Sequence, residues 1–276
     1  MAYAYPGDGA LDYYPVRYGT SRVVFRGPRP RLDQPYCVAL GGTETYGRFV
    51  ARPFPALVET ELGHPVVNLG CGNAGPDVFL QDPAVLEVAQ GALVVVLQVL
   101  GAANLSNRFY SVHPRRNDRF LRASPRLQAL YPEVDFTEFA FTRHLLTVLE
   151  RVDPERFTMV RAELQTAWAA RMSDLLRQLA RPVLLLWLSG QQPPPPEAAS
   201  LRHTPVLVDA GMIATLRPLA CDFLAVVPSA AALAVGVEGM AFASPDRAAA
   251  LELPGPLVHR EIAQALTPRL HRLVRQ

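Results

Sequence analysis

Apolar runs of strand length alternate with longer segments of helical periodicity along most of the chain. The apolar runs predict buried strands at residues 38–40, 65–69, 92–100, 181–188 and 223–227. Helices are expected at residues 47–62, 82–90, 136–149, 154–180, 210–219 and 257–274, the first one interrupted near Pro53 and Pro55. Because strand, crossover helix and strand follow one another, parallel pairing with right-handed connections is expected.

This order predicts the fold class α/β, as a single doubly wound, flavodoxin-like domain with about five parallel strands and flanking helices. The domain is expected over residues 36–276. Residues 1–35 form an arm rich in Tyr, Pro, Gly and Arg, with tyrosines at positions 3, 5, 13, 14 and 18. Aromatic residues at this density favour an arm that packs on the body or on a partner, including a homo-oligomer formed through the arm.

Composition narrows the class of function. The net charge of +2 over 276 residues gives no case for a nucleic-acid or membrane partner. Three cysteines, at positions 37, 71 and 221, give no disulfide framework and no zinc spacing. The first 12 residues lack the features of a signal peptide, and no apolar run approaches the ~20 residues of a membrane span. A cytoplasmic protein with reduced thiols is therefore expected.

No metal or cofactor site is predicted. The six histidines are scattered without the spacing of metal ligands. The segment Gly70-Cys71-Gly72-Asn73-Ala74-Gly75 has only some of the glycines of a dinucleotide-binding loop, and it follows the second strand. The expected ligand is instead a small molecule or a saccharide.

The candidate chemistry lies where three strands end. The first strand runs into Gly41-Gly42-Thr43-Glu44-Thr45-Tyr46-Gly47, in which Gly41 and Gly42 can take positive φ and Thr43 or Thr45 can cap the next helix. The second strand is followed by the glycine-rich segment that contains Asn73, and the third by Gly101-Ala102-Ala103-Asn104. Open α/β sheets place their ligand sites at this edge.

These three segments, in this order, resemble the signature blocks of the SGNH or GDSL-like hydrolases. The resemblance places Thr43 at the position of the nucleophilic serine and Gly42 at that of the preceding aspartate. It gives the backbone N–H of Asn73 or Gly72, and the side chain of Asn104, the role of holding the oxyanion. Asn107 is a second possibility for Asn104, and a plain glycine turn is the alternative for residues 72–75.

The last signature block departs from the family. SGNH hydrolases carry the catalytic histidine just before the last helix, with an aspartate three residues ahead of it. Here His259 takes the place of the histidine, and Pro256 stands where the aspartate would be. Two alternatives follow: His259 corresponds to the structural histidine found inside that helix in the family, or it is the catalytic histidine and Asp246 or Glu252 supplies the carboxylate.

A polar, irregular segment is expected at residues 106–135, as a cover over the site. Arg108, Arg115 and Arg116 are candidates for binding a carboxylate, sulfate or phosphate group of a ligand. The alternative is a solvated loop whose arginines pair with Asp118. Glu44 and Thr45, beside Thr43, are further candidates for contact with the substrate.

Two functions follow. The first is an SGNH-like esterase or acyltransferase acting on an acyl or acetyl ester, including esters of carbohydrates, with Thr43 as nucleophile and His259 as base. The second is an SGNH-like module with an eroded catalytic set, which binds a saccharide or an anionic ligand. The chain is also similar to a set of bacterial proteins that carry both Gly-Gly-Thr-Glu-Thr-Tyr-Gly and His-Pro-Arg-Arg-Asn-Asp.

Overall fold

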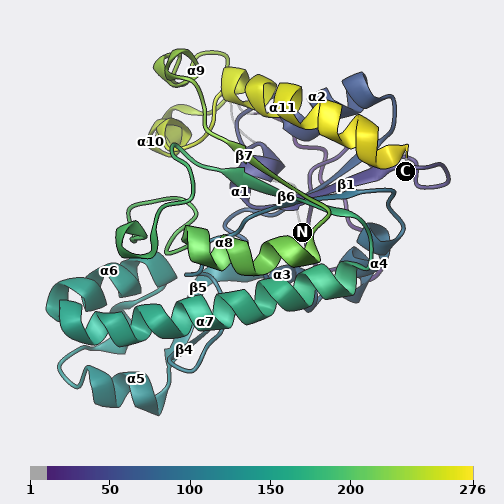
Figure 1. Cartoon of the computed structure of the whole chain (residues 1–276). Helices are drawn as coiled ribbons and strands as arrows, with labels where there is room; N and C mark the ends of the chain where they lie inside the picture. The colour runs from purple at the N-terminus through teal and green to yellow at the C-terminus, as the bar shows by residue number, and fades with distance from the viewer. Residues whose placement is uncertain (1–10, 276) are drawn as a thin grey trace.

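A five-stranded parallel sheet forms the centre of the molecule. In a computed structural model that describes residues 11–275, its strands lie in the order β2-β1-β3-β6-β7 (Figure 1). Their bounds are β1 Cys37–Gly41, β2 Val66–Gly70, β3 Val95–Gln98, β6 Val183–Leu188 and β7 Asp222–Val226. Counted within the parallel sheet alone, this is the flavodoxin-like order 2-1-3-4-5. The predicted doubly wound α/β fold with five parallel strands is confirmed.

Helices bury both faces of the sheet (Figure 1). Because side chains alternate along a strand, Val38 and Leu40 of β1 join one apolar cluster, and Cys37 and Ala39 join the other. The first cluster includes residues of α3 Asp77–Leu80, α4 Pro83–Gln90, α7 Pro154–Leu179 and α8 Ala210–Leu216. The second includes residues of α2 Phe54–Leu62, α9 Ala230–Ala234 and α11 Pro256–Val274. Burial on both faces explains the continuous apolar runs.

The segment after β3 is more regular than its sequence suggests. It forms an antiparallel hairpin of β4 Tyr110–His113 and β5 Arg116–Ala123, followed by α5 Pro125–Leu130, η1 Phe136–Glu138 and α6 Thr142–Val152. The expectation of an irregular loop was therefore wrong. Tyr110, Val112 and Phe120 are buried between neighbours that are less buried, but a register shift in the hairpin interrupts the alternation that would have revealed the strands.

The first expected helix, over residues 47–62, forms only from Phe54 onward, as α2. A separate short helix, α1, spans Thr43–Tyr46 before it and ends at Gly47, whose φ of 71° is left-handed. The remaining elements are short: η2 Pro196–Ala198, η3 Arg217–Leu219, η4 Ser244–Asp246 and α10 Arg247–Leu251. No helix of the described part of the chain is both long and apolar enough to cross a membrane.

The described part of the arm, residues 11–35, packs on the body. Tyr18 and Phe25 are fully buried, and the Tyr13 hydroxyl accepts a hydrogen bond from the Phe49 N–H. Arg26 donates to three main-chain carbonyls around α1, those of Tyr46, Gly47 and Ala51. Tyr3 and Tyr5 lie outside the described residues. Assembly through the arm stays a prediction.

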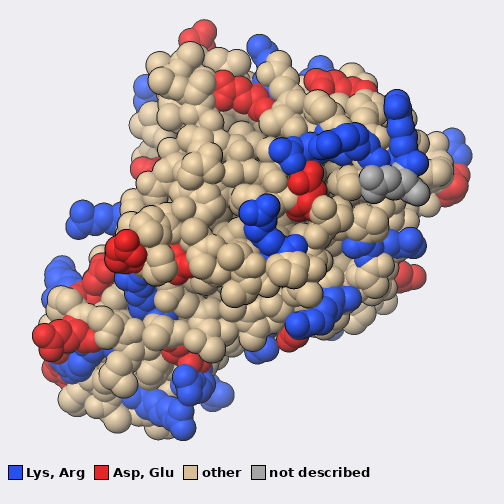
Figure 2. Space-filling model, in the orientation of Figure 1, with Lys and Arg blue, Asp and Glu red and all other residues tan. Residues whose placement is uncertain are grey.

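Charged side chains of both signs occur on the face that Figure 2 displays. Basic and acidic side chains are interspersed there, in agreement with the net charge of +2. This distribution offers no extended basic surface for a polyanion on that face.

Candidate functional site

The turn after β1 requires glycine at position 41 because neighbouring side chains leave no room for a Cβ atom. A Cβ at Gly41 would lie 2.1 Å from Thr45 Oγ1 and 2.5 Å from Gln98 Oε1, so only glycine fits there. The expected positive φ is not the reason, since Gly42 has a φ of −86° and Gly41 is not among the positive-φ residues. The expectation that Thr43 or Thr45 caps the helix was also wrong, because α1 begins at Thr43 and its N-cap, Gly42, makes no side-chain cap.

The side chain of Gln98, at the end of the adjacent strand β3, holds this turn in place through hydrogen bonds. Its Oε1 accepts hydrogen bonds from the Gly42 N–H at 2.9 Å and from Thr45 Oγ1 at 2.6 Å. Its Nε2 donates to Glu44 Oε2 at 2.8 Å. Gln98 and Thr45 are both buried. Thr45 thus supports the turn, while Glu44 is held with its carboxylate at the sheet edge.

Three of the sequence-predicted site residues meet in one chain of hydrogen bonds. Thr43 Oγ1 accepts from the Asn73 N–H at 2.9 Å, and Asn104 Nδ2 donates to the Asn73 carbonyl at 2.9 Å. Asn73 has a φ of 53°, the left-handed geometry that asparagine tolerates. Asn73 rather than Gly72 therefore contacts Thr43, and Asn104 rather than Asn107 reaches the site. Asn107 instead accepts from the Phe109 and Tyr110 N–H groups.

The inserted segment adds to this chain. Asp118 of β5 accepts from Asn73 Nδ2 at 3.2 Å, and Thr142 at the start of α6 donates to Asn104 Oδ1 at 2.7 Å. Gly75 lets the loops after β2 and β3 touch, since a Cβ there would lie 1.5 Å from the Asn104 carbonyl oxygen. Segments far apart in sequence thus hold each other at the carboxyl edge of the sheet.

These groups line a cleft of about 500 Å³. Its walls include Thr43, Asn73, Asn104 and the ring of Phe141, which is 42% exposed and carries the Arg119 guanidinium 4.3 Å from its centroid. The charged residues of the lining are Glu44, Asp118, Arg143, Arg202 and Glu252. Three carboxylates against two guanidinium groups leave the cleft without an excess of positive charge.

His259 does not reach this cleft. It is 1% exposed, stacks on Phe54 and accepts the Phe54 N–H at Nδ1 over 3.1 Å. Burial, with a smaller contribution from the nearby Arg26 guanidinium, lowers the pKa of His259 to about 3. The expectation that His259 acts as a base beside Thr43 is therefore corrected. His259 is a neutral residue that joins α11 to the start of α2.

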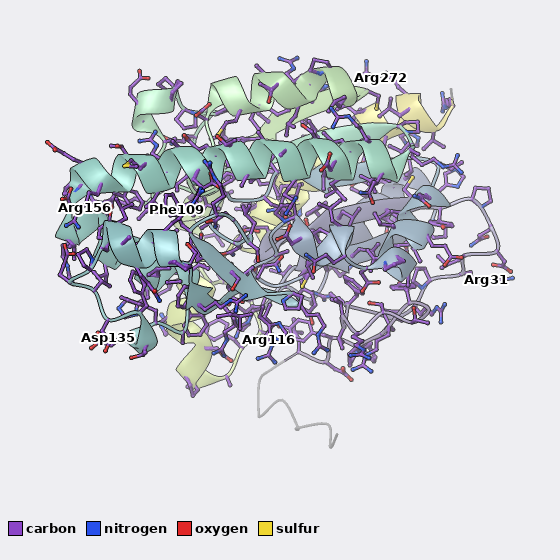
Figure 3. All side chains as sticks on the ribbon, turned by 90° about the horizontal axis from the view of Figure 1, so that it is seen from below. Arg31, Phe109, Arg116, Asp135, Arg156 and Arg272 are labelled. Carbon is purple, nitrogen blue, oxygen red and sulfur yellow. The ribbon has the colours of Figure 1, made fainter. Side chains whose placement is uncertain are left out.

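The other expected carboxylates and arginines are also placed. Asp246 pairs with Arg48 at 3.0 Å, whereas Glu252 lines the cleft. Arg108 forms an ion pair with the buried Glu163. Arg115 and Arg116 are exposed and are not part of the cleft lining (Figure 3 labels Arg116 on the hairpin). The expected anion site made by these three arginines is not assembled at the cleft.

Sequence reasoning missed Gln98, Asp118, Phe141 and Thr142 as site residues. A signal existed for Gln98, which is the one amide in the apolar run of residues 92–100. For Asp118 the sequence indicates only a pairing with the loop arginines. Phe141 and Thr142 precede and open a helix whose direction the sequence does not give. Within residues 11–275, no group of three or more His, Cys, Asp and Glu side chains could hold a metal ion.

Comparison with known proteins places the chain in a family. The family profile described as "Domain of unknown function (DUF6473)" matches residues 1–274. The chain belongs to this family. No curated protein matches the sequence.

Solved structures of similar shape are distant from this DUF6473 protein. One is the lipase Lip_vut3 from a goat rumen metagenome, 15% identical, with a TM-score of 0.43 over 87% of this chain and 100% of that chain. Another is the protein YXIM_BACsu from Bacillus subtilis, 14% identical, with a TM-score of 0.38 over 86% of this chain and 57% of that chain.

Proposed function

We propose that the cleft at the carboxyl ends of β1, β2 and β3 binds a saccharide. The observation that carries this proposal is the chain of amide, hydroxyl and carboxylate groups from Thr43 through Asn73 to Asn104 and Asp118. Side chains held in place by one another present donors and acceptors without a large ordering cost on binding. Sugar hydroxyls both donate and accept, and so they match a wall of this mixed kind.

Two further features favour a neutral, hydroxylated ligand over an anionic one. The ring of Phe141 is partly exposed at the cleft wall and offers an apolar surface for the C–H face of a sugar ring. The cleft also carries more carboxylates than guanidinium groups. An anionic ligand would therefore meet repulsion from Glu44, Asp118 and Glu252 as well as attraction from the arginines.

A glycan array probed with the full chain tests the proposal, followed by titration calorimetry with each glycan that binds. Phe141→Ala is expected to weaken binding about tenfold, by removing the ring contact. Met159→Ala, which truncates a 56% exposed side chain outside the cleft, is the matched control and is expected to bind like wild type. An array without any bound glycan, or equal losses in both variants, would contradict the proposal.

Ester hydrolysis is the second candidate, and it rests on the position of Thr43. The SGNH resemblance expects a hydroxyl beside the Asn73 N–H and the Asn104 amide, and Thr43 lies in contact with Asn73. Its Oγ1 would attack the ester carbonyl while its proton passes to a carboxylate of the cleft. The C–O bond to the alcohol would then break, the alcohol would leave with that proton, and water would hydrolyse the acyl-threonine to release the acid. The candidate ranks second because the described hydrogen bonds of Thr43 Oγ1 go only to Asn73, at 2.9 Å and 3.4 Å, and no described histidine lines the cleft.

Release of p-nitrophenol from p-nitrophenyl acetate separates the two candidates. Catalysis by Thr43 predicts that Thr43→Ala abolishes turnover while Thr43→Ser retains it. Thr137→Ala, at an exposed residue of η1 outside the cleft, controls for background hydrolysis by the protein surface. Equal rates in wild type and Thr43→Ala would exclude the hydrolase.

A further inference from the structure

A second pocket adjoins the cleft at the carboxyl ends of β6 and β7. It has a volume of about 250 Å³, and its walls are largely apolar, with Leu188, Val226, Ala232, Leu233, Val258 and Ile262 among them. We call it the apolar pocket. It shares Glu44, Thr204, Glu252 and Leu253 with the cleft. In Figure 1, α9 and α10 lie at the N-terminal end of α11, and the segments around them build this pocket.

The charges of the apolar pocket all have one sign. Glu44 and Glu252 are the charged residues of its lining. Neither carboxylate forms an ion pair within the described part of the chain. The carboxylate of Glu44 accepts a hydrogen bond there from the neutral amide of Gln98. Two carboxylates without a cationic partner thus stand where the apolar pocket meets the cleft.

The apolar side of the pocket is also left uncovered. Leu233 and Leu251, which line it from α9 and α10, are 56% and 61% exposed. Large apolar side chains exposed together at the rim of a pocket mark a binding surface more often than side chains scattered singly. The volume exceeds that of an engineered apolar cavity of roughly 150 Å³ that takes up benzene, so a chain of about six to eight carbons fits.

We propose that the apolar pocket binds a protonated amine with an aliphatic or aromatic body. The body lies among the leucines and valines, and the ammonium group lies between Glu44 and Glu252. A carboxylate of the same ligand would face repulsion from both side chains, and an uncharged head group would gain no ionic attraction. The site is separate from the proposed saccharide site, although the two share their boundary residues.

Three probes with the same chain and different head groups test the proposal at pH 7. n-Hexylamine, 1-hexanol and hexanoate are titrated into the full chain by isothermal calorimetry. Hexylamine is expected to bind at least about tenfold more tightly than hexanol, and hexanoate more weakly than either. Failure of hexylamine to bind, or equal binding of hexylamine and hexanoate, would overturn the proposal.

Matched variants locate the binding. Glu252→Gln is expected to weaken hexylamine binding about fivefold, whereas Glu238→Gln, which removes an exposed carboxylate outside the pocket, leaves it unchanged. Leu251→Ala is expected to weaken it about threefold, whereas Leu121→Ala, at a 54% exposed leucine of β5, has no effect. Equal effects within either pair would show that the amine binds elsewhere and would overturn the assignment.

The two proposals fail separately. Phe141 lines the cleft and not the apolar pocket. The Phe141→Ala variant is therefore expected to bind hexylamine like wild type, even though its binding of saccharide is weakened. Loss of hexylamine binding in Phe141→Ala would contradict the placement of the amine in the apolar pocket. An array without glycan hits would leave the hexylamine result standing on its own.

Discussion

The backbone N–H of Asn73 donates to Thr43 Oγ1 over 2.9 Å, and this bond joins the loop after β2 to the first residue of α1. The two loops belong to adjacent strands, paired in register from Cys37 and Val66 to Gly41 and Gly70. Parallel pairing therefore brings the hydroxyl and the amide to the same edge. The bond occupies the N–H that the SGNH resemblance assigns to an oxyanion.

Removing the acceptor of this bond is expected to loosen the loop. Thr43→Ala should lower the free energy of unfolding by about 1 kcal/mol, the typical net contribution of one hydrogen bond. The Asn73 amide proton should also exchange faster with solvent. Denaturant unfolding and hydrogen exchange by NMR measure the two effects. Thr43→Ser keeps the oxygen and should restore both values, so a loss of the same size in Thr43→Ser would contradict the role of the hydroxyl.

Gln98 is expected to matter more for stability than for contact with a ligand. Gln98→Leu keeps a similar volume but leaves the buried Gly42 N–H and the Thr45 hydroxyl without their acceptor. Unsatisfied buried donors predict a loss of about 2–4 kcal/mol in the free energy of unfolding. Gln178→Leu, on the exposed side of α7, provides the control and should change stability by less than about 0.5 kcal/mol. A small effect in Gln98→Leu would mean that the turn after β1 does not need this amide.

Two glycines of the loop after β2 should respond very differently to alanine. At Gly75 a Cβ would lie 1.5 Å from the Asn104 carbonyl oxygen, a contact that only movement of the backbone can relieve. Gly75→Ala should therefore cost about 3 kcal/mol or more in the free energy of unfolding. Gly72 has no atom within 4 Å of such a Cβ and no positive φ, so Gly72→Ala should stay within about 0.5 kcal/mol of wild type. Thermal unfolding of the pair is sufficient, and similar melting temperatures would refute the close approach of the two loops.

Burial of His259 makes stability depend on pH. Its pKa is lowered to about 3 in the folded chain, against about 6.5 in the unfolded chain. Between these values the unfolded state binds a proton that the folded state does not, so the free energy of unfolding falls as pH drops below about 6.5 and levels off near 3. From pH 7 to pH 5 the loss from this residue is expected to be about 2 kcal/mol.

Urea unfolding at pH 7 and pH 5 checks this linkage. His259→Gln removes the titrating ring and should flatten the difference between the two pH values, although the variant is less stable at pH 7. His271→Gln, in the last turn of the same helix, should retain the difference seen in wild type. An unchanged pH dependence in His259→Gln would show that another group causes it.

The sequence predicts most of this sheet because each strand carries its own signal. The runs ending at Gly41 and Leu188 are apolar on both faces, which is typical of central parallel strands. The run ending at Gly70 belongs to the edge strand β2 and is marked by its valines and leucine around Asn68. The meeting of Thr43, Asn73 and Asn104 follows from parallel order alone, since the carboxyl ends of neighbouring strands share one edge.

The role of His259 could not be predicted in the same way. Its position in the first turn of α11 is compatible with a ring that points to the sheet edge or into the helix packing. The direction of the ring depends on how α11 is rotated against α2. Phe54 is the first residue of α2, so its N–H has no acceptor within the helix, and it donates to the imidazole nitrogen of His259 instead. Such a pairing across 205 positions leaves no local pattern in the sequence.

The strand order β2-β1-β3-β6-β7 divides the molecule into two consecutive halves that meet between β3 and β6. Most of the polar wall of the cleft comes from residues 42–143, and most of the apolar pocket comes from residues 188–262. During synthesis the ribosome thus completes the hydrogen-bonded wall before it makes β6, the strand on which the second half assembles.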